Sequence, residues 1–314
     1  MASVGYDNTV RLWDLLKGVT VTAIIEERQQ KVERDTQINA LSWKRPGAYP
    51  PKENLLCIAS VAGSVKVVDA KKAKIVSRIH LTSSTIFETD WNVNGIVACS
   101  ENCSIYFLKY SMDEANEQNN LNLVKVLTLE CPIRTVQWNP INPSILAAGT
   151  FTGFIFIIDG KTFEQKQTLS SHIPEKIMSV AWHPCFDYIL ATASSDSIVR
   201  VWDIKNNGHK KLEYHKSRVR CVLWNHELPW LLLSGGDDSS LAAWDIRTNE
   251  LIAESLEPSI SFSSLTSHPS KPFTLISSHL DNSLVIWDVL GLQDVYQVQL
   301  KLLCDIKDEE ISCD

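Results

Sequence analysis

Hydroxyl, imidazole and carboxylate side chains recur in this 314-residue sequence in the combination that Ser-His-Asp hydrolases use. In two copies a His lies 19 or 20 residues before a Ser or Thr, and an Asp follows that hydroxyl four residues later. These copies are His172, Thr192 and Asp196, and His215, Ser234 and Asp238. Because the set repeats at a fixed spacing, we interpret it as structural and expect no catalytic residue.

Other chemical motifs are incomplete or missing. His226-Glu227-Leu228-Pro229-Trp230 begins like the zinc-protease motif HExxH, but Trp230 replaces the second His and Pro229 would break the helix. The sequence has no GxxxxGK[ST], GxGxxG or GxSxG motif. The remaining His residues stand singly, so we expect no metal site and no cofactor.

The segments that carry the recurring residues are themselves repeated. Two segments align without a gap at an offset of 42 residues (219 minus 177): Ile177–Lys205 and Val219–Arg247. Each repeat has four short strand-like runs separated by turn residues. A period near forty with a Trp-Asp ending is typical of propeller blades.

In four repeats a Trp follows the Asp by six residues. The four sets are Ser3, Asp7 and Trp13; Thr192, Asp196 and Trp202; Ser234, Asp238 and Trp244; and Ser277, Asp281 and Trp287. With these residues the sequence resembles the WD-repeat β-propeller family, in which His, Ser/Thr, Asp and Trp form a hydrogen-bonded network within a blade. A buried carboxylate needs donors, and imidazole and indole N–H groups can supply them.

The resemblance implies an all-β fold, a seven-bladed β-propeller of four-stranded antiparallel blades formed by residues 1–314 as one domain. The third strand ends in an acid in six repeats, at Asp14, Asp69, Asp159, Asp203, Asp245 and Asp288. The second to fourth repeats depart from the pattern, since Val68, Leu108 and Ile158 replace the third-strand Trp. Their turn Asp is replaced by Ala62, Asn102 and Thr152. We expect apolar packing alone to hold these blades together.

The chain opens in the middle of a repeat, so the first blade lacks its own inner strand. Glu310–Asp314 resembles Ile86–Asp90, which directly precedes Trp91. We expect residues 300–314 to supply the missing strand and to close the ring by pairing with the N-terminal segment, because closure removes exposed sheet edges. A start in mid-repeat also fits a segment of a longer protein, and both possibilities stay open.

Composition narrows the setting and the partners. A net charge of −7 argues against broad binding to nucleic acid or to an anionic membrane. The sequence has no run of about 18 apolar residues, so no membrane insertion is expected. Eight dispersed cysteines without a CxxC fit reduced thiols, which indicates a cytoplasmic setting, with the nucleus as the alternative.

Two segments could bind partner proteins. Lys205–Arg220 carries six cations and the single acid Glu213, and could attract an acidic or phosphorylated partner segment, although a solvated outer strand is the simpler interpretation. The six cations are Lys205, Lys210, Lys211, Lys216, Arg218 and Arg220.

The second segment is Leu232–Arg247, which resembles the Trp-Asp-x-Arg box by which some WD-repeat proteins dock on the adaptor of a cullin-type ubiquitin ligase. Trp244, Asp245 and Arg247 fit this box, whereas Ala243 departs from it. The preceding repeat has Lys205 at the Arg position, and Lys lacks the planar fork of Arg.

We therefore predict a non-enzymatic protein–protein interaction scaffold that works within a multiprotein complex. The first alternative is a substrate receptor of a cullin-type ubiquitin ligase that docks through Arg247. The second is a propeller enzyme, which would need acids or His residues to converge on the central channel. The step from fold to scaffold is an analogy with the family.

Overall fold

The computed structural model describes ten stretches of the chain, and the regular elements in them are all β-strands. The described residues are 2–4, 9–14, 20–26, 37–45, 54–113, 118–256, 261–268, 271–281, 283–290 and 299–306. The chain divides into two compact units. The N-terminal unit comprises residues 1–139, 143–151 and 155–168, and the C-terminal unit comprises residues 140–142, 152–154 and 169–314.

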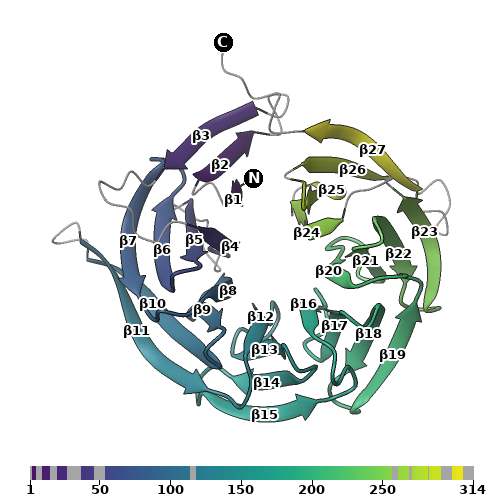
Figure 1. The fold of residues 1–314 in the computed structure, drawn as a ribbon, viewed down its shortest axis with the longest axis horizontal. Helices are drawn as coiled ribbons and strands as arrows, with labels where there is room; N and C mark the ends of the chain where they lie inside the picture. The colour runs from purple at the N-terminus through teal and green to yellow at the C-terminus, as the bar shows by residue number, and fades with distance from the viewer. Residues whose placement is uncertain are drawn as a thin grey trace. The chain divides into compact units, whose positions relative to one another are not determined.

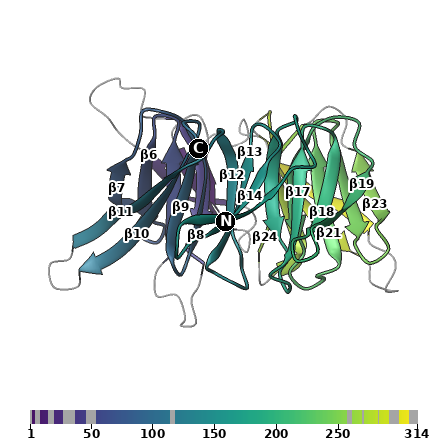
Figure 2. The same cartoon turned by 90° about the horizontal axis from the view of Figure 1, so that it is seen from below.

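The N-terminal unit contains one three-stranded sheet followed by three four-stranded sheets, all antiparallel (Figure 1). The first sheet is β1 (Ala2–Val4), β2 (Thr9–Asp14) and β3 (Thr20–Glu26); the second is β4 (Ile38–Trp43), β5 (Leu55–Ser60), β6 (Ser64–Asp69) and β7 (Lys74–His80). The third is β8 (Ile86–Asn92), β9 (Gly95–Ser100), β10 (Ser104–Asp113) and β11 (Gln118–Thr128); the fourth is β12 (Ile133–Trp138), β13 (Ile145–Thr150), β14 (Ile155–Asp159) and β15 (Glu164–Leu169). The long strands β10 and β11 extend past the other strands of this unit (Figure 2).

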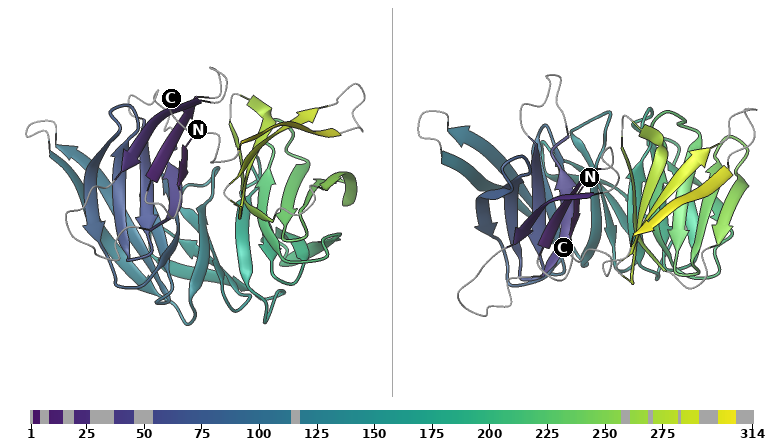
Figure 3. Two further views of the ribbon diagram at one scale, coloured as in Figure 1. Left: turned by 45° about the horizontal axis from the view of Figure 1, so that its top comes forward. Right: turned by 90° about the horizontal axis from the view of Figure 1, so that it is seen from above.

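The C-terminal unit contains three four-stranded antiparallel sheets. They are β16 (Ile177–Trp182), β17 (Ile189–Ser194), β18 (Ile198–Asp203) and β19 (Gly208–Glu213); β20 (Val219–Trp224), β21 (Leu231–Gly236), β22 (Ser240–Asp245) and β23 (Glu250–Leu256); and β24 (Phe262–His268), β25 (Lys271–His279), β26 (Leu284–Leu290) and β27 (Gln299–Ile306). Figure 3 shows the strands of the last sheet side by side in yellow and yellow-green.

The 42-residue repeat is visible in the backbone itself. Pairing shifts at a bulge between Ile177 and Ser179 in β16, and again between Val219 and Cys221 in β20. An extra residue at this point bends the strand and increases its twist. The same offset that aligns the side chains therefore also aligns the irregularities of the strands.

The Asp of the Trp-Asp pair caps a turn in two successive sheets of the C-terminal unit. Asp203 Oδ1 accepts the Lys205 backbone N–H at 3.0 Å, and Asp245 Oδ1 accepts the Arg247 backbone N–H at 2.9 Å. A short carboxylate that bonds the backbone two residues on stabilises such a turn, because it replaces a backbone partner. This capping fixes the turns that lead into β19 and β23.

Successive sheets share an apolar core. In the C-terminal unit, alanines of β17 and β22 pack with Val219, Trp224 and Trp244 in one buried cluster. The small side chains of one sheet leave room for the indole rings of the next, so the sheets approach closely. The boundary between two successive sheets is called a seam below.

The expected four-stranded antiparallel blades are confirmed for six sheets. The expected first blade is present as the three-stranded sheet β1-β2-β3, and among the described strands only β2 pairs with β1. Residues 299–306 form β27, which pairs with β26 as the fourth strand of the last sheet. The segment Glu310–Asp314, on which the closure prediction rests, lies outside the described residues. The expectation that residues 300–314 supply the missing strand is therefore wrong for residues 300–306, and closure through residues 307–314 stays a prediction.

Candidate functional site

A hydrogen-bonded chain of side chains runs through the sheet β16–β19. The Trp202 indole N–H donates to Thr192 Oγ1 at 2.9 Å, and that hydroxyl lies 2.8 Å from His172 Nε2. His172 Nδ1 lies 2.9 Å from Asp196 Oδ2. A carboxylate can only accept, so the imidazole proton is on Nδ1 and the Thr192 hydroxyl donates to Nε2. Each polar side chain from the Trp202 indole to the Asp196 carboxylate thus has a hydrogen-bond partner.

Electrostatics keep this chain in one protonation state. Burial lowers the pKa of His172, so the imidazole is neutral. Burial alone would raise the pKa of Asp196, but hydrogen bonds from His172 and Arg200 outweigh it and lower the pKa to about 2. The carboxylate is therefore an anion that accepts from both neighbours at neutral pH.

The next sheet repeats the arrangement. The Trp244 indole N–H donates to Ser234 Oγ at 2.9 Å, Ser234 Oγ lies 2.8 Å from His215 Nε2, and His215 Nδ1 lies 3.1 Å from Asp238 Oδ1. Asp238 Oδ2 also accepts the Lys216 backbone N–H at 2.7 Å. Burial works to raise the pKa of Asp238, yet the hydrogen bonds from His215, Ser240 and Lys216 hold it well below its usual range. Our expectation that the indole serves the carboxylate is wrong, because the indole bonds to the hydroxyl.

These chains have the connectivity of a Ser-His-Asp triad but cannot act as one. Thr192 and Ser234 are both 0% exposed, and each hydroxyl already accepts an indole N–H. A nucleophile must reach the substrate, and neither oxygen can do so. In the described part of the chain, no three His, Cys, Asp or Glu side chains gather where they could hold a metal ion.

The other two predicted sets differ. In the last sheet the Trp287 indole N–H donates to Ser277 Oγ at 2.8 Å, and the imidazole partner is His279 Nε2 at 2.7 Å. This His follows Ser277 by two residues instead of preceding it, which is why spacing did not reveal it. Asp281 is exposed and bonds to Ser283. For the set Ser3, Asp7 and Trp13, Asp7 and the Trp13 side chain lie outside the described residues.

The expectation that apolar packing alone holds the second to fourth blades is wrong. Arg45 Nη2 donates to Asp90 Oδ2 at 2.8 Å, and its Nη1 donates to the Trp138 carbonyl at 3.2 Å. Asp90 Oδ2 also accepts the Trp138 backbone N–H at 2.8 Å. One arginine and one carboxylate thus link three successive sheets. The apolar replacements Val68, Leu108 and Ile158 are buried as well.

A second carboxylate spans the same seam. Glu88 Oε2 on β8 accepts the Val136 backbone N–H of β12 at 3.0 Å. Burial raises the pKa of Glu88 to about 7, against the hydrogen bonds from Thr135 and Val136 and the charge of Arg134. Burial also raises the pKa of Asp90, against the charge of Arg45. The N-terminal unit therefore keeps two carboxylates at a seam that disfavours their charge.

The basic segment Lys205–Arg220 does not form one patch. Arg218 Nε lies 2.8 Å from Asp237 Oδ2, and Arg220 pairs with the same carboxylate. Lys205 precedes β19 and Lys216 follows it, whereas Lys210 and Lys211 lie in the middle of β19 and point to its opposite faces. A six-residue strand spans about 17 Å, so Lys205 and Lys216 are far apart, and two of the six cations are already paired with Asp237.

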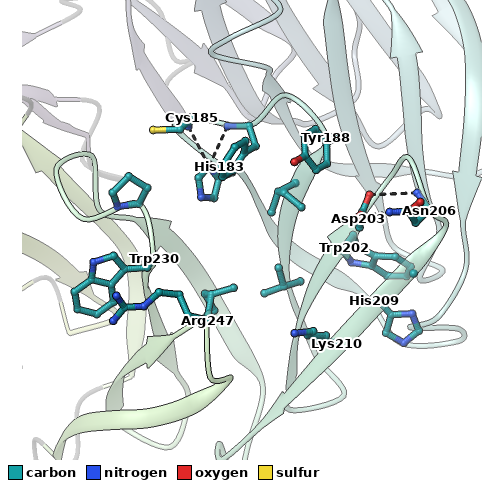
Figure 4. A pocket seen from close by; sticks show the side chains of 16 residues that line it. His183, Cys185, Tyr188, Trp202, Asp203, Asn206, His209, Lys210, Trp230 and Arg247 are labelled. Atoms are coloured by element: carbon teal, nitrogen blue, oxygen red, sulfur yellow. Dashed lines mark hydrogen bonds between the residues drawn. The ribbon is translucent and has the colours of Figure 1, made fainter. Parts of the chain in front are cut away.

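A groove of about 830 Å³ lies at the seam between the sheets β16–β19 and β20–β23, within the C-terminal unit (Figure 4). Loops that follow first strands and turns that follow third strands line it. Its aromatic members are His183, Phe186, Tyr188, Trp202, His209 and Trp230. Lys210 and Arg247 are its cationic members.

Two cation–aromatic pairs flank the groove, one from each sheet. Lys205 Nζ lies 3.9 Å from the centre of the Tyr188 ring, and the Arg247 guanidinium carbon lies 4.2 Å from the centre of the Trp230 ring. Tyr188 and Trp230 are related by the 42-residue offset, as are Lys205 and Arg247. The sequence analysis did not identify Tyr188 or Trp230 as site residues. The 42-residue offset that relates Lys205 to Arg247 also relates these two aromatic residues and could have revealed them.

Hydrogen bonds to Asp245, two residues earlier, orient the Arg247 side chain. Its Nη2 donates to Asp245 Oδ2 at 2.6 Å, and its Nε donates to Asp245 Oδ1 at 3.0 Å. These hydrogen bonds and the positive charge hold the pKa of Asp245 below its usual range. The Arg247 side chain remains 46% exposed. The guanidinium is thus fixed in direction and still accessible to a partner.

Comparison with known proteins agrees with the repeats. The family model described as WD domain, G-beta repeat matches residues 163–203 and 208–245. The model described as anaphase-promoting complex subunit 4 WD40 domain matches residues 7–94. The chain belongs to the WD-repeat β-propeller family. Both matched G-beta repeats end at the Asp of a Trp-Asp pair, Asp203 and Asp245.

Curated members of this family are similar to the chain over about two thirds of its length. The protein transport protein sec31 of Aspergillus oryzae is 27% identical over 232 residues, which is 68% of this chain and 17% of that protein. Its counterpart in Emericella nidulans is 25% identical over 215 residues, 66% of this chain and 16% of that protein. The matched region thus spans less than a fifth of each relative.

A solved structure supports the same fold. A chain from a crystal structure of the mitotic checkpoint complex superposes with a TM-score of 0.70 and 20% sequence identity, covering 86% of this chain and 79% of that chain. The WD-repeat chain is therefore a β-propeller with four-stranded antiparallel blades. Within its described stretches, no helix is long and apolar enough to cross a membrane.

Proposed function

We propose that this WD-repeat chain is a non-enzymatic protein–protein interaction scaffold that works within a multiprotein complex in the cytoplasm. The observation that carries the proposal is the groove of the C-terminal unit, where aromatic rings and cations are accessible while the recurring polar residues are buried. Trp, Tyr and Arg are the residues on which protein interfaces most depend. The only hydroxyl–imidazole–carboxylate chains found in the described blades are buried and leave no exposed nucleophile.

The test is affinity purification of the tagged chain from cells, followed by size-exclusion chromatography. We expect a defined set of proteins to co-elute with the chain at constant stoichiometry. Since the similar proteins named above are protein transport proteins, transport assemblies are the first class to examine. A chain that elutes alone as a monomer from every cell type tested would contradict the proposal.

The second candidate function is docking on a ubiquitin-ligase adaptor through the Trp-Asp-x-Arg box. The fixed, half-exposed guanidinium of Arg247 favours it, because a planar fork can bind a carboxylate with two hydrogen bonds. If this function is right, purified adaptor binds the chain, and Arg247→Lys abolishes binding as fully as Arg247→Ala. Equal binding by all three chains would exclude it.

The seven-bladed ring is part of the proposal. The three-stranded sheet β1-β2-β3 lacks the first strand that each of the other six sheets has. We propose that residues 307–314 supply it. Deleting these eight residues should lower the melting midpoint by several degrees, whereas a neutral deletion would exclude this form of closure.

A further inference from the structure

The groove combines an apolar wall with unusual exposure of aromatic side chains. Phe186 is 48% exposed although it packs between His183, at 4.9 Å, and Tyr188, at 5.6 Å, measured between ring centres. Ile246 and Pro229 add aliphatic surface. A volume of about 830 Å³ falls in the range of sites that bury a ligand (roughly 300–1,000 Å³). The wall is therefore suited to one or more bulky apolar side chains.

The charge of the groove is asymmetric. Arg247 and Lys210 lie toward the same end in Figure 4, away from His183 and Cys185. None of the described carboxylates lies within ion-pair distance of Lys210, whereas Asp245 orients Arg247. An ammonium group without a carboxylate and an oriented, accessible guanidinium each attract an anion.

We propose that this groove binds a linear acidic peptide segment of a partner protein, with a bulky apolar residue on the aromatic wall and acidic residues that face Lys210 and Arg247. The inference rests on the proposed scaffold function and names one of its sites. The positive charges of Lys210 and Arg247 favour acidic residues in the peptide, and the exposed aromatic rings favour a neighbouring apolar residue. Stacking on Trp230 holds the Arg247 guanidinium in place before the peptide arrives, which reduces the entropy lost on binding.

Adjacent lysines provide a matched pair of variants. Lys210 lines the groove, whereas Lys211 does not, although both are exposed. They pair with Val201 and Arg200, respectively, and successive side chains of a strand point to opposite faces. Lys210→Glu and Lys211→Glu therefore make the same change in net charge on opposite faces of β19.

The experiment selects binders of the full chain from a phage-displayed library of linear peptides. We expect the enriched peptides to place an Asp or Glu close to an aromatic or large aliphatic residue. In fluorescence polarisation with one such peptide, Lys210→Glu should weaken binding about 10-fold or more, and Trp230→Ala about 30-fold. Lys211→Glu should change it less than about 3-fold, and circular dichroism melts should show that all variants remain folded.

Cys185 gives an independent readout at the site. It is exposed and lines the groove, whereas Cys57, Cys99 and Cys221 are buried. Burial raises the pKa of Cys57 and Cys221 to about 12, so these thiols react slowly. Saturating peptide should slow alkylation of Cys185, measured by mass spectrometry of its proteolytic fragment.

Several outcomes would overturn the proposal. These are a library without binders, enriched peptides without an acid, equal weakening by the two lysine variants, or unchanged alkylation of Cys185. Peptides that bind with affinities insensitive to Trp230→Ala would move the site elsewhere and leave the scaffold function intact. The scaffold function itself fails only if the purification recovers no partner.

Discussion

The two units place their buried polar groups differently. In the C-terminal unit the chains from Trp202 and Trp244 connect strands and an adjoining loop of one sheet. In the N-terminal unit Arg45, Glu88 and Asp90 connect successive sheets. The four-stranded sheets of both units have the same antiparallel strand order, so strand order does not determine where these polar groups lie.

The seams differ accordingly. Beside Phe107 and Trp138 the seam between β8–β11 and β12–β15 leaves a space of about 50 Å³. The seam between β16–β19 and β20–β23 leaves about 830 Å³. Across this second seam the Trp224 indole N–H donates to the Ala181 carbonyl at 2.9 Å, so a hydrogen bond between sheets and the groove occur at the same seam.

The largest expected effect is at Asp90. Asp90→Ala removes the acceptor for the Trp138 N–H and leaves Arg45 without its carboxylate, so we expect a loss of about 3–5 kcal/mol in the free energy of unfolding. Urea denaturation followed by tryptophan fluorescence measures it. Arg45→Met should cost less, because the backbone N–H donors of Asp90 remain. A loss under about 1 kcal/mol for Asp90→Ala would show that the links between sheets are not needed.

A smaller loss is expected in the C-terminal unit. Asp238→Ala removes the acceptor of His215, Ser240 and the Lys216 N–H, at a cost of roughly 1–3 kcal/mol. The bond from Trp244 to Ser234 is retained, so near-ultraviolet circular dichroism of the indole should change little. Asp281→Ala is the matched control, because that carboxylate is exposed and accepts its hydrogen bonds from Ser283. If the two variants had equal melting midpoints, the internal network would carry no stability.

The sequence predicts the blades better than it predicts their contacts. Repeated Trp-Asp pairs identify β18 and β22 because capping and indole burial both depend on local sequence. The links between sheets could not be predicted, because their partners are far apart in the sequence. Arg45 lies 45 residues from Asp90 and 93 residues from Trp138. His279 was missed because it follows Ser277 by two residues, whereas His172 and His215 precede their hydroxyl residues by about twenty. Tyr188 and Trp230 were accessible to prediction through the 42-residue offset, yet the groove between them depends on tertiary packing.

The units should also respond oppositely to pH. The pKa of Glu88 is raised to about 7, so between its ordinary value near 4.5 and pH 7 the folded chain binds more protons than the unfolded chain. Stability from this group is therefore present at low pH and is lost as the pH rises through about 7. His172 has a lowered pKa, so it acts in the other direction and costs stability as the pH falls below its ordinary value of about 6.5.

Comparing wild type with Glu88→Gln separates the two groups. Melting midpoints measured between about pH 5 and pH 8 should fall with rising pH more steeply in the wild type than in this variant. The difference between the two curves belongs to Glu88, since His172 is common to both. Parallel curves would mean that the Glu88 carboxyl titrates as it does in water.

The smallest effect on stability is expected at Arg247. Its ion pair with Asp245 is half-exposed and the Trp230 stack lies on the groove wall, so Arg247→Ala should change the free energy of unfolding by less than about 1 kcal/mol. Arg200→Ala makes the same substitution at a buried guanidinium bonded to Asp196, and should cost clearly more. Chemical denaturation of the two variants gives the comparison directly. Because Arg247 contributes little to folding, a loss of partner binding in Arg247→Ala would report recognition at the groove; a destabilisation as large as that of Arg200→Ala would instead make the cation–aromatic pair part of the fold.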